Sequence, residues 1–335
     1  MRKFLVTGGA GFIGSNFIRY LIKNTDCFII NVDLLTYAGN IENLKDVEAN
    51  RNYIFHKGDI CDSSFIKYLF EKYDFDVVVN FAAETHVDNS INRPNLFVNT
   101  NILGTQVLLE CARRSWKYGF ENNVNSKKNV KFIQISTDEV YGSLGEYGLF
   151  SEMSSISPSS PYSASKASAD LIVHSYYKTY GLPINITRCT NNYGPYQYPE
   201  KLIPLMVYNS LNDKPLLIYG NGLQIRDWIH VQDHCLAIHL VIEKGIIGEI
   251  YNIGANEEHS NIDIVNRIIS FVNFSNSRIE YINDRLGHDF RYGIDSSKIR
   301  KELKWYPKIN FEQGFSDTIQ WYIKNKNWIN RVKSI

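Results

Sequence analysis

The sequence lacks the features that mark secreted, membrane-spanning and nucleic-acid-binding proteins. Its 36 basic and 35 acidic residues leave a formal net charge of only +1, so no global basic field attracts nucleic acid. The five cysteines are odd in number and lack the paired spacing of a zinc site, and we expect them to be reduced and mostly buried. No apolar run is long enough to span a bilayer, and the one after Met1 is too short for a signal peptide. We therefore expect a cytoplasmic protein with small-molecule partners and no metal, nucleic acid or membrane partner.

The chain does contain enough apolar sequence for a large core. Of its 335 residues, 44% are hydrophobic and 21% are charged, which is ordinary for a globular protein. No repeats, low-complexity tracts or long linkers interrupt it. Its length suits one large unit or one domain with a smaller lobe.

The start of the chain predicts a strand, a glycine turn and a helix. Lys3 to Val6 is apolar, Gly8, Gly11 and Gly14 follow, and Ser15 to Ile22 is amphipathic. Glycines at this spacing let the backbone turn sharply, approach a pyrophosphate and pack the helix against the sheet. A lone glycine pattern is weak evidence. Its place between a strand and a helix favours dinucleotide binding over a plain turn.

Asp33 ends the second predicted strand, Phe28 to Val32, about 20 residues after the glycines, where a carboxylate hydrogen-bonds the adenosine ribose. A carboxylate at this place also repels a 2′-phosphate. The adjoining Asn31, Leu34 and Leu35 supply no arginine to attract one, so NAD is favoured over NADP. If Asp33 is considered without the glycine motif, the alternative to a ribose ligand is an ordinary turn residue.

Two further strands are predicted to end at the same edge of the sheet. Tyr53 to His56 closes in Gly58-Asp59-Ile60, and Val77 to Phe81 closes in Ala82-Ala83-Glu84-Thr85. The two alanines permit a flat cofactor to approach closely, although small residues at a strand end are as often packing.

A long helix is predicted over residues 97–114. Its apolar residues are spread over more than one face, which suits cover by the sheet and by a partner subunit. Residues 115–129 are polar and rich in Asn and Lys, so we expect an exposed connection there.

Val130 to Glu139 predicts a buried strand that ends in Ser136, Thr137, Asp138 and Glu139. In an open α/β sheet this end faces the ligand crevice. A hydroxyl and two adjacent acids are placed there for proton transfer at neighbouring atoms of a substrate. The alternative is that Thr137 and Asp138 merely cap the next segment.

A helix is predicted from Pro161 to about Tyr180, with Tyr162 and Lys166 on one face. A tyrosine has an ordinary pKa of about 10, too high for a base near neutrality. A nearby ammonium and the positive nicotinamide of NAD would both favour the phenolate. Alone, the pair is a common surface coincidence, but after a dinucleotide fingerprint it favours a catalytic role.

The regular alternation of predicted strands and helices ends after a sixth strand, Ile184 to Arg188, and a turn at 191–195. Short apolar pieces such as Leu216 to Tyr219 and helices near 231–243 and 261–273 predict a smaller lobe. We therefore expect an α/β protein: a Rossmann-type doubly wound parallel sheet in residues 1–190, to which some later segments return, and a smaller α/β lobe mainly in 191–335. Several side chains of this lobe suit phosphates, although scattered surface charge is the alternative for each one: Lys201, Arg226, Arg285, His288 and Arg291.

Taken together, these motifs resemble the extended short-chain dehydrogenase/reductases that act on nucleotide sugars, and more narrowly the dTDP-glucose 4,6-dehydratases. The resemblance runs from Lys3 to roughly Trp321 through TGGAGFIGS, DLLTYAGN, GDI, FAAETHVDNSI, NTNILGT, STDEVYG, YSASKA, TNNYGPYQYPEKLIP, RDWIHV and GHDFRYGID. The specific signature is Thr137-Asp138-Glu139, because epimerases and decarboxylases of this group do not need the acid pair. The chain departs at Thr85, where the family often has serine, and at Leu286, where an Arg-Pro-Gly-His turn is usual.

The resemblance implies an internal redox cycle with tightly held NAD that turns dTDP-glucose into dTDP-4-keto-6-deoxyglucose. Tyr162, with Lys166 and Thr137, would take the C4 hydroxyl proton while the C4 hydride passes to NAD. Glu139 would remove the acidified C5 hydrogen, protonated Asp138 would release the C6 hydroxyl as water, and the hydride would return to C6. The alternatives are a UDP-glucose 4,6-dehydratase, a nucleotide-sugar 4-epimerase and, outside enzymes, a redox sensor that binds NAD without turnover.

The same resemblance assigns two sets of binding residues and implies a homodimer that pairs the helices near 97–114 and 162–180. The NAD set comprises Gly8, Gly11, Phe12, Ile13, Gly14, Asp33, Leu34, Leu35, Thr36, Asp59, Ile60, Ala82, Ala83, Thr100, Tyr162, Lys166 and Asn192. The sugar-nucleotide set, mainly in the smaller lobe, comprises Thr85, Thr137, Asn191, Lys201, Leu202, Leu217, Tyr219, Arg226, Asn261, Arg285, His288 and Tyr292.

Overall fold

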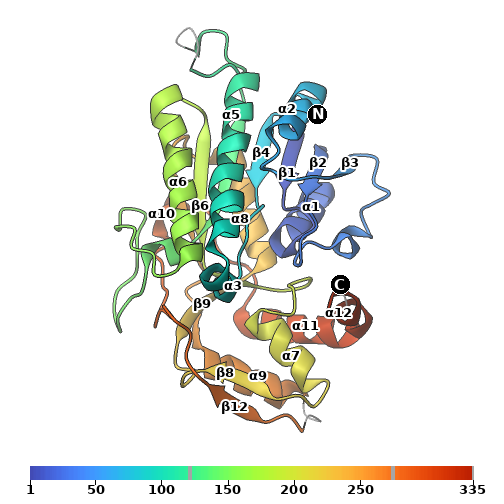
Figure 1. Ribbon diagram of the computed structural model, residues 1–335, viewed down its shortest axis with the longest axis vertical. Coiled ribbons are helices and arrows are strands. Elements are labelled where there is room, and N and C mark those ends of the chain that lie inside the picture. The colour runs from blue at the N-terminus through green and yellow to red at the C-terminus, as the bar shows by residue number, and fades with distance from the viewer. Residues whose placement is uncertain (120–122, 273–275, 334–335) are drawn as a thin grey trace.

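A seven-stranded parallel sheet organises the chain in the computed structural model, which describes residues 1–119, 123–272 and 276–333 (Figure 1). Its strands are β1 (Lys3–Thr7), β2 (Phe28–Asp33), β3 (Tyr53–Lys57), β4 (Val77–Asn80), β5 (Lys131–Thr137), β6 (Ile184–Cys189) and β10 (Ile250–Ile253). They lie in the order β10-β6-β5-β4-β1-β2-β3, and every neighbouring pair is parallel. This confirms the expected Rossmann-type doubly wound sheet.

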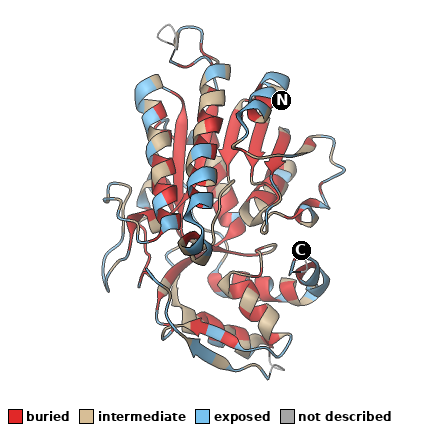
Figure 2. Cartoon of the chain, in the orientation of Figure 1, coloured by how far each residue is buried: buried red, intermediate tan, exposed pale blue. Residues whose placement is uncertain are grey.

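Helices cover both faces of the sheet, which explains why β4 and β5 are buried along their whole lengths (Figure 2). One face packs against α1 (Phe12–Asn24), α8 (Val231–Lys244) and α10 (Ser297–Leu303). The other packs against α2 (Ser63–Tyr73), α5 (Thr105–Ser115) and α6 (Pro161–Tyr180). Figure 1 shows α5 and α6 side by side in front of the sheet and α8 behind it.

The helix expected over 97–114 is longer and less regular. It begins as α4 (Pro94–Phe97), continues as a π-helix (Val98–Gly104) and ends as α5. Inside the π-helix, buried Asn101 accepts a hydrogen bond from the Glu84 amide (2.8 Å) and donates to the Ser165 hydroxyl (2.8 Å). Asn101 therefore links the loop after β4 to α6. The widened helical turn thus lies beside the candidate site, where π-helical turns are often found.

The connection expected to be exposed over 115–129 is partly buried. Trp116 is fully buried and its indole donates to the Phe75 carbonyl at 2.8 Å, because the chain packs back onto the end of α2. Residues 120–122 of this connection lie outside the described residues.

The later chain forms a smaller lobe below the sheet (Figure 1). Its strands are β7 (Asn191–Tyr193), β9 (Ile225–His230) and β11 (Glu258–Ser260) in one sheet, and β8 (Leu216–Tyr219) with β12 (Ile279–Ile282) in another. Its helices are α7 (Leu202–Ser210), α9 (Asn261–Val272), α11 (Phe311–Lys324) and α12 (Lys326–Lys333). The turn expected at 191–195 therefore begins as a short strand. Three shorter elements also flank the cavity or its connections: the helix α3 (Val87–Asn92) and two 3₁₀ turns (Ile41–Leu44 and Asp138–Tyr141).

None of the helices in the described part of the chain has both the length and the apolarity needed to cross a membrane.

Candidate active site

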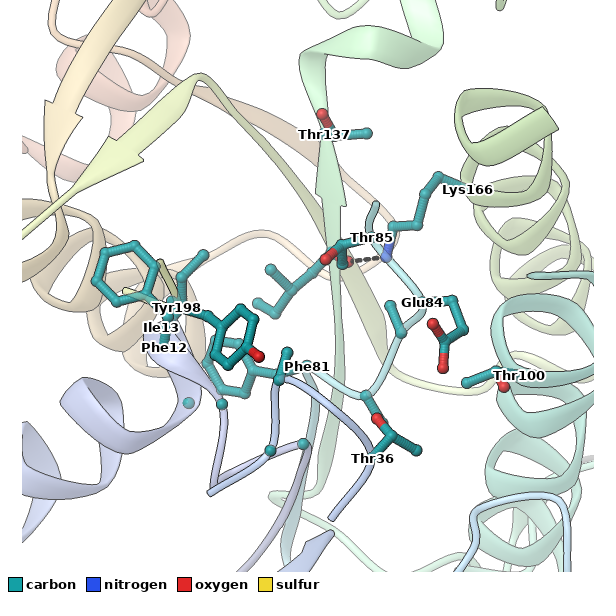
Figure 3. Close-up of a pocket in the computed structure, with 18 of the residues that line it drawn as sticks. Phe12, Ile13, Thr36, Phe81, Glu84, Thr85, Thr100, Thr137, Lys166 and Tyr198 are labelled. Carbon is teal, nitrogen blue, oxygen red and sulfur yellow. Dashed lines mark hydrogen bonds between the residues drawn. The ribbon is translucent and has the colours of Figure 1, made fainter. Parts of the chain in front are cut away.

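A cavity lies at the carboxyl ends of the central strands, where the strand order reverses beside β1 (Figure 3). It is lined by every residue of the expected NAD set except Leu35: Gly8, Gly11, Phe12, Ile13, Gly14, Asp33, Leu34, Thr36, Asp59, Ile60, Ala82, Ala83, Thr100, Tyr162, Lys166 and Asn192. Leu35 instead packs against the hydrophobic core. The cavity also includes all five residues expected to be catalytic.

The glycine turn makes a cradle that fits a dinucleotide. Gly8 has a φ of +67°, and a Cβ there would lie 2.6 Å from the Ala82 amide nitrogen of the neighbouring strand end. A Cβ on Gly14 would lie 2.4 Å from the Gly8 carbonyl oxygen. No side chain caps the start of α1, whose N-cap is Gly11, so its first amides face the cavity. Such amides are the usual partners of a pyrophosphate.

Asp33 is fixed at the end of β2 by two backbone amides. Its carboxylate accepts hydrogen bonds from Ala10 (2.9 Å) and Leu35 (2.8 Å). Burial raises the pKa of Asp33, and these two hydrogen bonds oppose the rise. The amides therefore favour the ionised carboxylate that a ribose ligand requires.

Thr137 caps the following turn and also lines the cavity, so its capping contacts are compatible with the proposed role at the site. Its hydroxyl accepts from the Glu139 amide (3.2 Å) and donates to Asp138 Oδ1 (3.1 Å). These contacts hold the acid pair in the first turn of the 3₁₀ helix that follows β5.

The two acids, of which Asp138 is buried and Glu139 partly buried, lie in different electrostatic surroundings. Burial raises the pKa of Asp138 well above its ordinary value, and the negative charge of Glu139 raises it further. Burial also raises the pKa of Glu139, but the positive charges of Arg226 and Lys201 oppose that rise. The surroundings thus raise the pKa of Asp138 further than that of Glu139, so that Asp138 holds its proton more tightly than Glu139, as in sites where neighbouring carboxyls act separately as acid and base.

Tyr162 and Lys166 lie on α6, which begins with a capping box formed by Ser160 and Ser163. Lys166 extends towards β5 and donates to the Ile135 carbonyl at 2.6 Å (Figure 3). Burial, followed by the charge of Glu139, raises the pKa of Tyr162 well above its ordinary value. The expected lowering of this pKa by Lys166 is therefore not observed in the protein alone, because the burial that surrounds the pair dominates and also lowers the pKa of Lys166.

The expected sugar-nucleotide set is divided by the structure. Thr85, Thr137, Asn191 and Lys201 line the cavity. The remaining members are outside its lining: Leu202, Leu217, Tyr219, Arg226, Asn261, Arg285, His288 and Tyr292.

The arginines of the smaller lobe differ in their surroundings. Arg226 is buried, donates to the Asp289 carbonyl at 2.9 Å and lies 4.2 Å above the Tyr292 ring. Its positive charge, like that of Arg285, favours ionisation of Glu139. Arg291, which we expected to join a phosphate site, instead pairs with Glu258 at 2.7 Å, in a separate pocket. The Glu258 carboxylate already neutralises its charge.

The sequence interpretation missed part of the cavity wall. Glu84, Tyr198 and Glu200 line the cavity, and Tyr37 donates to Glu200 at 3.2 Å. These residues come from three separate connections, so no local spacing links them. The DLLTYAGN and FAAETHVDNSI motifs contain Tyr37 and Glu84, but neither motif indicates which residues they would meet.

Known proteins similar to this chain include dehydratases and epimerases. The model of the family described as GDP-mannose 4,6 dehydratase matches residues 5–318. A dTDP-glucose 4,6-dehydratase of Salmonella typhimurium is 49% identical over 348 residues, covering 99% of this chain and 96% of the relative. The crystal structure of dTDP-glucose 4,6-dehydratase from Bacillus anthracis in complex with NAD is 48% identical, with a TM-score of 0.89 and coverage of 99% of this chain and 100% of that chain. A UDP-glucose 4-epimerase from Thermotoga maritima, solved with UDP-glucose, is 30% identical, with a TM-score of 0.86 and coverage of 97% and 99%. The fold alone therefore does not separate the two reactions.

Proposed function

This chain belongs to the GDP-mannose 4,6 dehydratase family, and from that premise we infer that it converts dTDP-glucose to dTDP-4-keto-6-deoxyglucose. It is a hydro-lyase that uses NAD as its cofactor. The observation that carries the inference is the acid pair at the end of β5, in which Asp138 is buried and Glu139 is partly buried. Epimerisation at C4 releases no water, so it needs no general acid at C6. Dehydration needs a general acid there, because the C6 hydroxyl must be protonated to leave as water.

Tyr162 is the proposed base for the C4 hydroxyl. The Thr137 hydroxyl favours the ionised form of Tyr162, and Lys166 is held at the adjacent strand by the Ile135 carbonyl. When bound, NAD supplies the acceptor for the C4 hydride and the donor that returns it to C6.

Glu139 and Asp138 are the proposed base and acid of the elimination. A ketone at C4 acidifies the C5 hydrogen, which Glu139 removes. Asp138 gives its proton to the C6 hydroxyl, which leaves as water. The pKa directions support this division, because Arg226 and Lys201 favour ionised Glu139 whereas Glu139 itself favours protonated Asp138.

Mass spectrometry after incubation with dTDP-glucose tests the function, with UDP-glucose as the parallel substrate. We expect a product lighter by one water, and faster conversion of the dTDP sugar. A 4-epimerase would leave the mass unchanged but change the stereochemistry, and a redox sensor would leave the sugar unchanged. Faster dehydration of UDP-glucose would contradict the proposed base preference, and an unchanged dTDP-glucose sample would contradict the function.

We also propose the organisation in which this reaction takes place. Residues 1–190 would hold NAD and residues 191–335 mainly the sugar nucleotide. Exposed apolar side chains on α4, the π-helix and α6 support a homodimer built on these helices: Leu96, Val98, Leu103 and Leu171. The five free thiols suit the reducing cytoplasm.

A further inference from the structure

Asp88 joins the two parts of the chain beside the cavity. It lies on α3, directly after the connection that follows β4, and its carboxylate meets Arg285 and Tyr219 of the smaller lobe. Arg285 Nε lies 2.6 Å from Asp88 Oδ1, and Arg285 Nη2 donates to Oδ2 at 3.0 Å. The Tyr219 hydroxyl donates to the same Oδ2 at 3.2 Å.

These contacts fix the orientation of the Arg285 guanidinium. Asp88 lies at the edge formed by Nε and Nη2, where Nη2 makes the hydrogen bond and Nε is close to Oδ1 without hydrogen-bond geometry. The Tyr219 ring lies against the guanidinium, with 4.9 Å between the Arg285 Cζ and the ring centroid. A guanidinium has five N–H groups in a rigid plane. Nη1 has no hydrogen-bond partner recorded in the described residues, so the end opposite Asp88 has donors to offer a second anion. The positive charge of Arg285 also acts on Glu139, which places it near the reacting groups.

We propose that Asp88 is a positioning residue that holds Arg285 ready for the pyrophosphate of the sugar nucleotide. This inference rests on the proposed function and deepens it. Ordering a long cationic side chain before the ligand arrives removes an entropic cost from binding. The opposite possibility is that Asp88 competes with the phosphates for Arg285, and the two predict opposite changes in affinity.

Titration of dTDP into the NAD-loaded enzyme separates these possibilities. Asp88→Asn keeps the shape of the side chain and removes its charge, and we expect about tenfold weaker binding. With dTDP-glucose the variant should show a raised KM and a nearly unchanged kcat, because Asp88 touches no reacting atom. Asp46→Asn is the control, since Asp46 also pairs with an arginine, accepting two hydrogen bonds from Arg19 (2.7 Å each) outside the cavity lining, and this variant should bind dTDP normally.

A double-variant cycle distinguishes positioning from a general structural effect. If Asp88 acts through Arg285, adding Asp88→Asn to Arg285→Gln should weaken dTDP binding no further. Unchanged or tighter dTDP binding by folded Asp88→Asn, or an equal additional loss in the double variant, would overturn the positioning role. Either result leaves the proposed function intact if the wild type still dehydrates dTDP-glucose. A wild type that neither binds dTDP nor dehydrates dTDP-glucose would overturn both.

Discussion

Among single residues, the adjacent carboxyl groups of Asp138 and Glu139 differ in how far their pKa values are raised. Asp138 is 3% exposed and has one oxygen, Oδ2, without a hydrogen-bond partner recorded in the described chain. Ionising it would leave a negative charge beside Glu139 in a buried site. For Glu139, the positive charges of Arg226 and Lys201 oppose the rise in pKa that burial causes. The difference between the acids therefore arises from their neighbours.

Glu139→Gln and Tyr162→Phe should divide the reaction into its two halves. Glu139→Gln removes the C5 base but leaves C4 oxidation possible, so absorbance from reduced nicotinamide should accumulate while product forms slowly. Tyr162→Phe should show neither signal. Loss of a positioned proton-transfer group costs about 10² to 10⁴ in rate.

Exchange of deuterium from solvent into C5 gives an independent readout of the same step. Wild type must reprotonate C5, so deuterium should enter its product. Product formation and C5 exchange at the wild-type rate in folded Glu139→Gln would exclude Glu139 as the base, leaving Asp138 or a water for that role.

Asp138→Asn should stabilise the folded protein near neutral pH while it slows dehydration. The folded state holds the Asp138 proton above the ordinary pKa of 3.8, so the unfolded chain ionises first and stability falls as pH rises through this range. Asparagine does not titrate, and we expect a gain of about 0.5–2 kcal/mol in the free energy of unfolding. Urea unfolding at pH 7 and below pH 3.8 measures it. The gain should disappear at the acidic pH, and an equal gain at both would contradict the argument.

At the scale of elements, α6 is joined to β6 by a buried ion pair. Arg188 Nε donates to Asp170 Oδ2 at 2.9 Å, and the two side chains are 3% and 2% exposed. The guanidinium also lies 4.8 Å from the centre of the Tyr141 ring. This pair lies one helical turn beyond Lys166, so it fixes the helix that carries the proposed catalytic residues.

Asp170→Ala should reduce the free energy of unfolding by about 3–5 kcal/mol, because it leaves the Arg188 charge buried without its partner. Urea unfolding measures the loss. The control is Glu71→Ala, which removes the partner of Lys67 in an exposed pair on α2 (3.8 Å) and should cost less than about 1 kcal/mol. Similar losses for the two variants would contradict a special role for the buried pair.

The glycine turn after β1 leaves no room for a side chain at Gly8. Gly8→Ala should lower stability by about 1–3 kcal/mol and reduce retained NAD, because a side chain there is strained by the positive φ and would meet the backbone at Ala82. Urea unfolding and the nucleotide content of the purified protein measure the two effects. Gly145→Ala is the control, since a Cβ at Gly145 meets nothing within 4 Å. Normal stability and NAD content in Gly8→Ala would contradict the close approach of β1 and β4.

At the scale of the whole molecule, contacts distant in sequence connect the sheet with the smaller lobe. The Trp328 indole on α12 donates to Asn43 Oδ1 at 3.0 Å, so the last described helix packs beside the connection after β2. Lys201 donates to the Thr85 carbonyl at 3.0 Å beside the cavity. The cavity is therefore bounded by segments from both parts of the chain.

The proposed homodimer is tested by sedimentation at several protein concentrations. Leu103→Glu and Leu171→Glu replace side chains that are 47% and 60% exposed, and each charge should shift a dimer towards monomer. Ile247→Glu changes a similarly exposed residue (46%) in the connection before β10 and should leave the dimer unchanged. A monomeric wild type, or equal dissociation in all three variants, would contradict an interface on these helices.

Features that depend on neighbouring residues can be predicted from the sequence alone. The strand, glycine turn and helix at the chain start follow from local periodicity and from backbone angles that glycine permits. Tyr162 and Lys166 share a helix face because they are four residues apart. The acids after β5 reach the cavity because they follow the carboxyl end of a parallel strand.

The three-dimensional packing, by contrast, sets which distant residues meet and how their ionisation changes. It added β10 beside β6, placed Glu200 beside Tyr37, and paired Asp88 with Arg285 although 197 positions separate them. In the protein without NAD, it also raises the pKa of Tyr162 above its ordinary value although Lys166 lies one turn away on the same helix. The spacing of Tyr162 and Lys166 specifies one charged neighbour, whereas the pKa depends on desolvation by every segment that packs around the phenol.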